Sequence, residues 1–172
     1  VMIFLEKPMQ VAGQPVGQFF VRTFSRHPEF APEGHSVAQV LIPSNWHAWN
    51  RLRDDRQAYE AEKEHVGDDL AARLEPHLPG IRAAIEEVDV ATPYTFWRYS
   101  RNYRGAYEGF MITPKTMTTR VPKTLPGLGN FYMAGQWVEP GGGLPAVIPS
   151  GKNVVRLICR ADGKQFQVTP PD

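Results

Sequence analysis

Asn130-Phe-Tyr-Met-Ala-Gly-Gln-Trp-Val-Glu-Pro-Gly-Gly-Gly-Leu-Pro-Ala-Val-Ile-Pro-Ser-Gly151 is the most informative segment of this chain, and it runs on into Lys-Asn-Val-Val-Arg-Leu-Ile-Cys159. The residues from Phe131 to Ala134 predict a short buried strand. Gly135 predicts a turn, 140–143 a glycine-rich loop, and Leu144 or Pro145 to Cys159 a helix that contains Gly151. Because glycine has no Cβ, such a loop brings backbone N–H groups and a helix N-terminus against a planar or anionic ligand. The segment therefore predicts a ligand-binding strand–loop–helix unit.

This order of residues resembles the C-terminal flavin-binding signature of the phytoene desaturase and carotenoid isomerase family, with its retinol-saturase relatives, among the FAD-dependent amine-oxidase-like enzymes. The family pattern is an apolar strand, Gly-Asp or Gly-Glu, Pro-Gly-Gly-Gly-x-Pro-Gly-Val, and Ser-Gly in the closing helix. Residues 25–35 also resemble the family's Asp-Pro-Ser-x-Ala-Pro-x-Gly turn. Residues 91–96, with 102–109, resemble its Thr-Pro-x-Thr segment and the glycine-rich run after it. The resemblance covers the chain from Val16 onward.

The resemblance implies a set of FAD-binding residues in the loop and at the start of the last helix. They are Gly135, Gln136, Gly141, Gly142, Gly143, Leu144, Pro145 and Val147. N–H dipoles at this helix start would stabilise the negative charge on the pyrimidine edge of a reduced flavin. Gln136 stands where the family has an acidic residue on the ribityl hydroxyls, and an amide can also donate and accept such bonds. Glu139 is an alternative for that contact, or else a solvated loop carboxylate. The alternative to FAD binding is a purely structural role, in which these residues form a tight crossover connection between the strand and the helix.

The Rossmann motif that would hold the ADP half of FAD is not found in these residues, because no GxGxxG occurs. Gly127-Leu-Gly129 precedes a predicted strand instead of joining a strand to a helix. We therefore expect the chain to be the C-terminal part of a longer oxidoreductase. We assign residues 1–130 to a partial substrate domain and 131–172 to a C-terminal FAD-binding segment. Alone, the chain is expected to be inactive and to bind FAD weakly or not at all.

The fold class is predicted to be α+β, with a mixed sheet and a long amphipathic helix beside the C-terminal unit. Strands are expected at Val1–Leu5, Val16–Phe24 and Ser36–Ile42, the last two as neighbours joined by a loop too long for a tight hairpin. A single helix is expected from Ala48 to Glu75, after an N-cap at Ser44-Asn45. Residues 81–90 are expected to form a helical turn and then a strand.

The predicted long helix carries an apolar stripe with a charged outer face. The stripe consists of Leu52, Tyr59, Val66, Leu70 and Leu74. Asp69 precedes Arg73 by four residues, so we expect an ion pair along the helix.

Six aromatic residues and three arginines gather between Tyr94 and Tyr107. One interpretation is an extended segment after the Thr92-Pro93 turn, in which alternate residues face the same side. Tyr94 and Phe96 would then line a tunnel for a long apolar substrate, with Trp97 and Tyr99 packed behind it. The alternatives are ordinary core packing and nucleic-acid binding. A net charge of +1 argues against nucleic acid.

Composition is that of a globular protein, with 172 residues, 42% of them hydrophobic and 22% charged. The single cysteine excludes an internal disulfide and fits a reducing compartment, so we expect a cytoplasmic protein and leave open a peripheral contact with a membrane. We expect Cys159 to be a buried small hydrophobe. The histidines show no metal-ligand spacing, and we predict no metal site.

The resemblance implies that the intact protein is an FAD-dependent oxidoreductase acting on a long apolar polyene, such as a carotenoid or retinoid, by desaturation, saturation or isomerisation. The sequence assigns no catalytic residue. The rival hypothesis is a non-catalytic substrate-binding or dimerisation module without flavin chemistry. In either case we expect the chain to self-associate, because its last strand and helix would lack a partner sheet.

Overall fold

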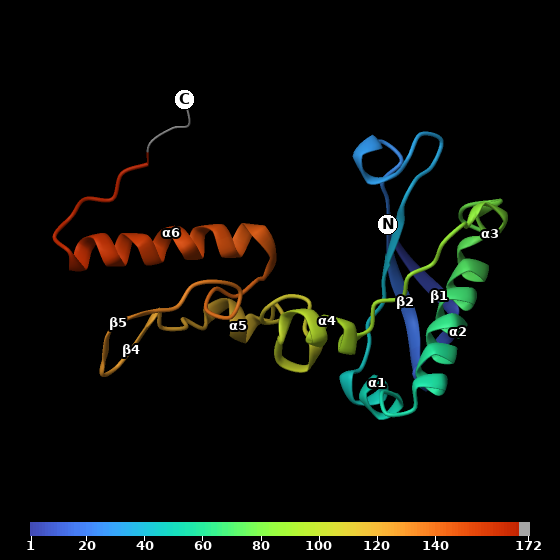
Figure 1. The fold of residues 1–172 in the computed structure, drawn as a ribbon, viewed down its shortest axis with the longest axis horizontal. Coiled ribbons are helices and arrows are strands. Elements are labelled where there is room, and N and C mark those ends of the chain that lie inside the picture. Colours follow the sequence, from blue (N-terminus) through green and yellow to red (C-terminus); the bar gives the residue numbers. More distant parts are fainter. Residues whose placement is uncertain (169–172) are drawn as a thin grey trace. The chain divides into compact units, whose positions relative to one another are not determined.

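The computed structural model describes residues 1–168, which form two compact units, one from Val1 to Ala106 and one from Tyr107 onward. These residues contain six α-helices and five strands, which confirms the α+β class (Figure 1). The division into a substrate domain and an FAD-binding segment stays a prediction. No helix within the described residues is both long and apolar enough to cross a membrane.

The first unit contains an antiparallel three-stranded sheet. Its strand order is β1 (Met2–Val11), β2 (Gln14–Thr23), β3 (Ala38–Leu41). The β1–β2 hairpin closes through Ala12-Gly13, whose φ angles of 50° and 73° are those of a tight primed turn. Its register shifts between Phe4 and Met9. Pro8 lies in that stretch and has no N–H to donate to a neighbouring strand.

The mixed sheet predicted from the sequence is wrong, because every strand pair in the described residues is antiparallel. A parallel neighbour needs a long crossover connection, whereas a two-residue turn joins β1 to β2. The loop from β2 to β3 contains one 3₁₀ turn, η1 (Pro28–Phe30), and no crossover helix, and β3 returns antiparallel beside β2. The prediction that these two strands are neighbours is confirmed.

The single helix expected over residues 48–75 is wrong, because the chain forms α1 (Trp46–Leu52) and α2 (Arg56–Leu74). The break falls where Asp55 accepts a hydrogen bond from the Ala58 N–H at 3.0 Å and so starts a new helix. Asn45 caps α1 as predicted, by accepting from the N–H groups of His47 and Ala48.

The core of the first unit lies between α2 and the β1–β2 hairpin, which run beside each other (Figure 1). Val66 and Leu74 of the predicted apolar stripe are buried there with Phe19 and Trp49. The predicted ion pair forms along α2, with Arg73 Nε 2.9 Å from Asp69 Oδ1. The same guanidinium donates to the Lys7 carbonyl at 2.8 Å and ties α2 to β1.

The strand expected before residue 90 is wrong, because only α3 (Ile81–Ala84) is regular between 81 and 92. The extended stretch after α3 lies against α2 instead of pairing with a strand. A Cβ built on Gly67 would stand 3.1 Å from Val88 Cγ1 and 3.7 Å from Val90 Cγ2. Helix α4 (Pro93–Ser100) and the 3₁₀ turn η2 (Tyr103–Gly105) complete the first unit.

The second unit contains α5 (Pro114–Thr118), the antiparallel hairpin β4 (Thr124–Leu125) and β5 (Leu128–Tyr132), and the long helix α6 (Gly143–Ala161). The predicted last helix is confirmed. The strand expected at 131–134 runs from Leu128 to Tyr132 instead, because it pairs across the Pro126-Gly127 turn. The expectation that it is buried is wrong, since four of its five residues are exposed. Cys159 is half-buried, so the expectation of a buried thiol is wrong.

Candidate cofactor site

The two ends of the glycine signature are joined by a hydrogen bond. Gly135 follows shortly after β5, and its N–H donates to Ser150 Oγ at 3.0 Å. Ser150 lies in α6 and is fully buried. Its hydroxyl therefore fixes the turn after β5 against the helix, and the loop between them is closed at its base.

The start of α6 differs from the starts of α1, α2, α4 and α5. Helix α3 also begins after a glycine, Gly80, and no side chain of that cap residue bonds the helix. Asn45, Asp55, Thr92 and Thr113 supply side-chain caps to α1, α2, α4 and α5. Gly142 precedes α6 with φ 60°, and no side-chain hydrogen bond caps that helix. The first N–H groups of a helix have no partner within it, so those of Gly143 and Leu144 lack an acceptor inside α6. N–H groups at a helix start can donate to an anionic ligand. The Glu108 carboxyl also lies at this start, with Oε1 3.4 Å from a Cβ built on Gly143.

Two of the predicted glycines leave open space beside the backbone. A Cβ added to Gly135 or to Gly141 would meet nothing within 4 Å. Gly142 is different, because its added Cβ would stand 2.8 Å from Glu108 Cβ and 2.9 Å from Glu108 Oε2. A flat ring can approach the chain at the first two positions, whereas Gly142 makes room for a side chain of the protein itself.

The remaining predicted FAD-binding residues lie around the same loop. Gln136 and Val147 are half-buried, and Leu144 and Pro145 are exposed at the helix start. Glu139 is not free for the ribityl contact, because its Oε2 lies 2.7 Å from Lys123 Nζ in a partly buried ion pair. That pair holds the loop to the segment before β4. The structure thus brings the predicted loop residues together, and their contacts with FAD stay a prediction.

The extended segment predicted for Tyr94 and Phe96 is wrong, because both residues lie in α4. Residues two apart on a helix point to nearly opposite sides, so they cannot line one wall. Tyr94 stacks on Trp97, with ring centroids 5.6 Å apart at 21°, and meets the Tyr59 ring edge-on at 6.3 Å. It belongs to an aromatic cluster between α2 and α4. Phe96 is 38% exposed.

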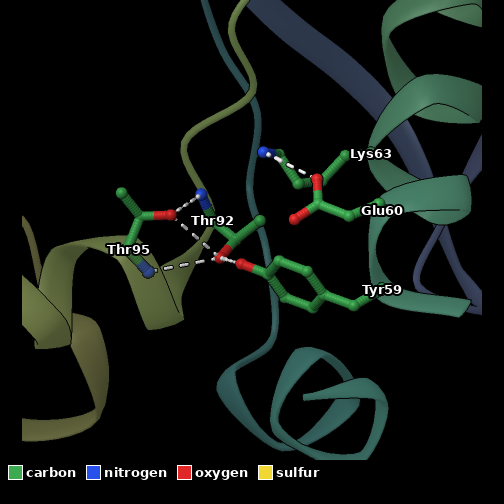
Figure 2. A network of polar contacts seen from close by, with 5 residues as sticks. All are labelled: Tyr59, Glu60, Lys63, Thr92 and Thr95. Carbon is green, nitrogen blue, oxygen red and sulfur yellow. Dashed lines mark hydrogen bonds and ion pairs between the residues drawn. The ribbon is translucent and has the colours of Figure 1, made fainter. Parts of the chain in front are cut away.

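The Thr-Pro-x-Thr segment forms a polar clamp between α2 and α4 (Figure 2). Thr92 Oγ1 accepts from the Thr95 N–H at 3.3 Å, and the Thr92 N–H donates to Thr95 Oγ1 at 3.1 Å. The Tyr59 hydroxyl meets Thr92 Oγ1 at 2.5 Å, while only 1% of Thr92 is exposed. Sequence reasoning missed this role, although a threonine three residues before another, with proline between, is a capping-box pattern.

Comparison with known proteins assigns the sequence of this chain to a family. The model of the flavin-containing amine oxidoreductases matches residues 14–159. Prolycopene isomerase 2, chloroplastic, of an Oncidium hybrid cultivar is 33% identical over 132 residues, which cover 72% of this chain and 21% of that protein. The 4,4'-diapophytoene desaturase (4,4'-diapolycopene-forming) of a Methylomonas species is 32% identical over 154 residues, which cover 87% of this chain and 29% of that protein. Phytoene dehydrogenase of Streptomyces griseus is 30% identical over 133 residues, which cover 76% of this chain and 25% of that protein.

The chain spans between 21% and 29% of the length of these three relatives. No solved structure matches it. The family match nevertheless covers most of the chain, including the β5–α6 loop and most of α6. This chain belongs to the flavin-containing amine oxidoreductase family.

Proposed function

We propose that the intact protein is an FAD-dependent oxidoreductase that acts on a long apolar polyene, such as a carotenoid or retinoid, by desaturation, saturation or isomerisation. This chain supplies the C-terminal part of its flavin site. The observation that carries the proposal is the uncapped start of α6 beside two glycines whose Cβ side is open. The names of the relatives, which refer to prolycopene, diapophytoene and phytoene, support the substrate class.

Each part of the loop has a separate task in this proposal. Gly135 and Gly141 let the backbone come close to the cofactor, since nothing occupies their Cβ positions. The N–H groups of Gly143 and Leu144 donate to an acceptor on the flavin, and the α6 dipole favours negative charge there. The Gln136 amide bonds a ribityl hydroxyl. When bound, FAD supplies the exchange of a hydride or electrons with the substrate.

An apolar stripe on α6 supports the expectation that more of the protein lies against this unit. Leu144, Ile148, Val155 and Ile158 recur on one side of the helix, and all four are exposed. Exposed stripes of this kind are normally covered by a partner surface. In the proposal, the cover is the part of the intact protein that holds the ADP half of FAD.

The same stripe also favours the rival hypothesis, a non-catalytic module that associates through α6. The two hypotheses differ in what a longer sequence would contain. A strand followed by GxGxxG and a helix supports the oxidoreductase. An unrelated domain in its place supports the module.

The direct experiment is to purify the longest natural protein that carries this chain and to record its visible spectrum. We expect a yellow protein with about one FAD per chain, which converts phytoene or prolycopene to a product with a changed absorption spectrum. A folded protein that takes up no FAD from solution would contradict the flavin proposal. A flavoprotein that leaves both polyenes unchanged would contradict the substrate class alone.

A further inference from the structure

A three-residue segment from Glu108 to Phe110 lies against the glycine loop although it is far from that loop in sequence. Its central residue makes the closest approach. A Cβ built on Gly109 would stand 2.0 Å from the Gln136 carbonyl oxygen, 2.7 Å from its carbonyl carbon and 3.1 Å from its Cβ. Two nonbonded atoms cannot lie 2.0 Å apart, and the backbone atoms of Gln136 cannot rotate away as the end of a flexible side chain can. Only glycine fits at position 109.

Gly109 is needed there for space and not for backbone conformation. It is absent from the glycines with positive φ in residues 1–168, so another residue could adopt its backbone angles. The cause of the restriction is therefore the contact with Gln136. That residue occupies the position to which the ribityl contact is assigned.

The two neighbours of Gly109 contact other parts of the same loop. Glu108 fills the space beside Gly142, where an added Cβ would meet its Cβ at 2.8 Å. Phe110 meets the Trp137 ring edge-on, with centroids 5.3 Å apart and planes at 89°. Edge-to-face pairs of this kind stabilise a contact beyond the area that they bury. Consecutive residues thus hold the loop at 136, 137 and 142.

We propose that the 108–110 segment is a positioning element, which sets the shape of the flavin loop together with the bond from Gly135 to Ser150. The proposal rests on the proposed flavin site. Gly109 acts through Gln136 and does not touch the cofactor itself. Displacement of the Gln136 backbone by the width of a methyl group moves the loop between its two fixed points, Gly135 and α6. A shift of about 1 Å in a positioning group is enough to cost a large part of binding or turnover.

The test compares Gly109→Ala with Gly129→Ala in the longest natural protein that carries this chain. Gly129 is a matched control, because it also lacks a positive φ and an added Cβ there meets nothing within 4 Å. The first readout needs no flavin: amide hydrogen exchange of peptides covering 133–142 in the FAD-free protein. The second readout is the dissociation constant of FAD, measured by quenching of flavin fluorescence.

We expect faster exchange in 133–142 and about tenfold weaker FAD binding in Gly109→Ala, with neither change in Gly129→Ala. Unchanged exchange in Gly109→Ala would overturn the proposed contact. Faster exchange with unchanged FAD affinity would overturn the positioning role. If the unsubstituted protein takes up no FAD, the flavin proposal fails, and the exchange data still decide whether the 108–110 segment holds the loop.

A second variant covers the case in which Gly109→Ala does not fold. Phe110→Ala removes the contact with Trp137 from a residue that is 41% exposed, so the fold should survive. For Phe110→Ala we expect faster exchange in 133–142 and weaker FAD binding, both smaller than in Gly109→Ala. Met111→Ala is its control, since Met111 is the next residue along the chain and its apolar side chain is 80% exposed. Equal effects of the two substitutions on exchange in 133–142 would overturn the proposal.

Discussion

Helices α4 and α6 begin in opposite ways, although the sequence around each start suggested a ligand site. At α4 the reciprocal hydrogen bonds of Thr92 and Thr95 satisfy the helix end, and Tyr59 adds a third partner. At α6 the chain turns through glycines, and no side chain caps the helix. A side-chain cap contributes stability and satisfies some of the N–H groups at a helix start, whereas a start without one lacks that stability and leaves those N–H groups without a cap. In our proposal, the Thr-Pro motif is structural and the glycine motif binds the flavin.

The largest expected effect is that of Gly142→Val at the open start. Gly142 has φ 60°, and a valine Cβ would be driven into Glu108, 2.8 Å away. We expect a loss of about 2–4 kcal/mol in the free energy of unfolding, together with loss of FAD from the intact protein. Denaturant titration and the flavin-to-protein ratio measure the two effects.

Gly129→Val serves as its control, because that residue lies in β5 with an open Cβ side. We expect little change in stability and in FAD content there. A folded Gly142→Val protein with a full complement of FAD would show that the loop is not at the flavin.

A smaller effect, of a different kind, is expected from Thr92→Ala at the closed start. The substitution removes the cap of α4 and the buried partner of the Tyr59 hydroxyl. Together these losses should lower the free energy of unfolding by about 2–3 kcal/mol, while FAD content stays unchanged. Thr92→Ser keeps the hydroxyl and should recover most of the loss in a denaturant titration. A Thr92→Ala protein that loses FAD but not stability would move the cofactor site to α4.

The smallest effect is expected at α3, where the carboxylate of Glu75 accepts hydrogen bonds from the helix start in place of a side chain of the cap residue. The N–H groups of Arg82 and Gly80 donate to Glu75 and hold the pKa of its carboxyl below the ordinary value of 4.5. A lowered folded-state pKa means that the stabilisation is complete above the unfolded-state pKa and is lost as the pH falls through the lowered value. Acidification below about pH 4.5 should therefore weaken this contribution.

Denaturant midpoints measured between about pH 6 and about pH 3 test this prediction with Glu75→Gln as the comparison. The variant should show a flatter dependence on pH than the unsubstituted chain. Since the carboxylate is exposed, the difference is expected to be small and to shrink further in high salt. Superimposable pH profiles would show that the two N–H contacts contribute nothing to stability.

Sequence reasoning succeeded where the determining interactions are local. The glycine loop and α6 were predicted because turn residues and an apolar stretch follow one another directly. The Asp69–Arg73 pair follows from a spacing of four residues on a helix. In the same way, Asn45 was recognised as a cap from its position before an apolar helix.

The wrong predictions arose where one local signal was given too much weight or where the contact is distant. The pair Ala12-Gly13 was not recognised as a turn, because alanine seldom adopts the positive φ it has here. Thr92-Pro93 was interpreted as the start of an extended segment, although threonine before proline equally begins a helix. The contacts of Glu108 and Gly109 with the loop could not be predicted, since they join segments that no periodicity relates.

The central claim is that backbone N–H groups at the start of α6 bind the flavin, and one pair of variants tests it directly. Leu144→Pro removes a single N–H that has no partner within the helix, and proline is tolerated in a first helical turn. Leu144→Ala removes the exposed side chain and keeps that N–H. In the intact protein, calorimetric titration with FAD should show about tenfold weaker binding for Leu144→Pro and nearly unchanged binding for Leu144→Ala. Equal affinity of the two variants would contradict the claim.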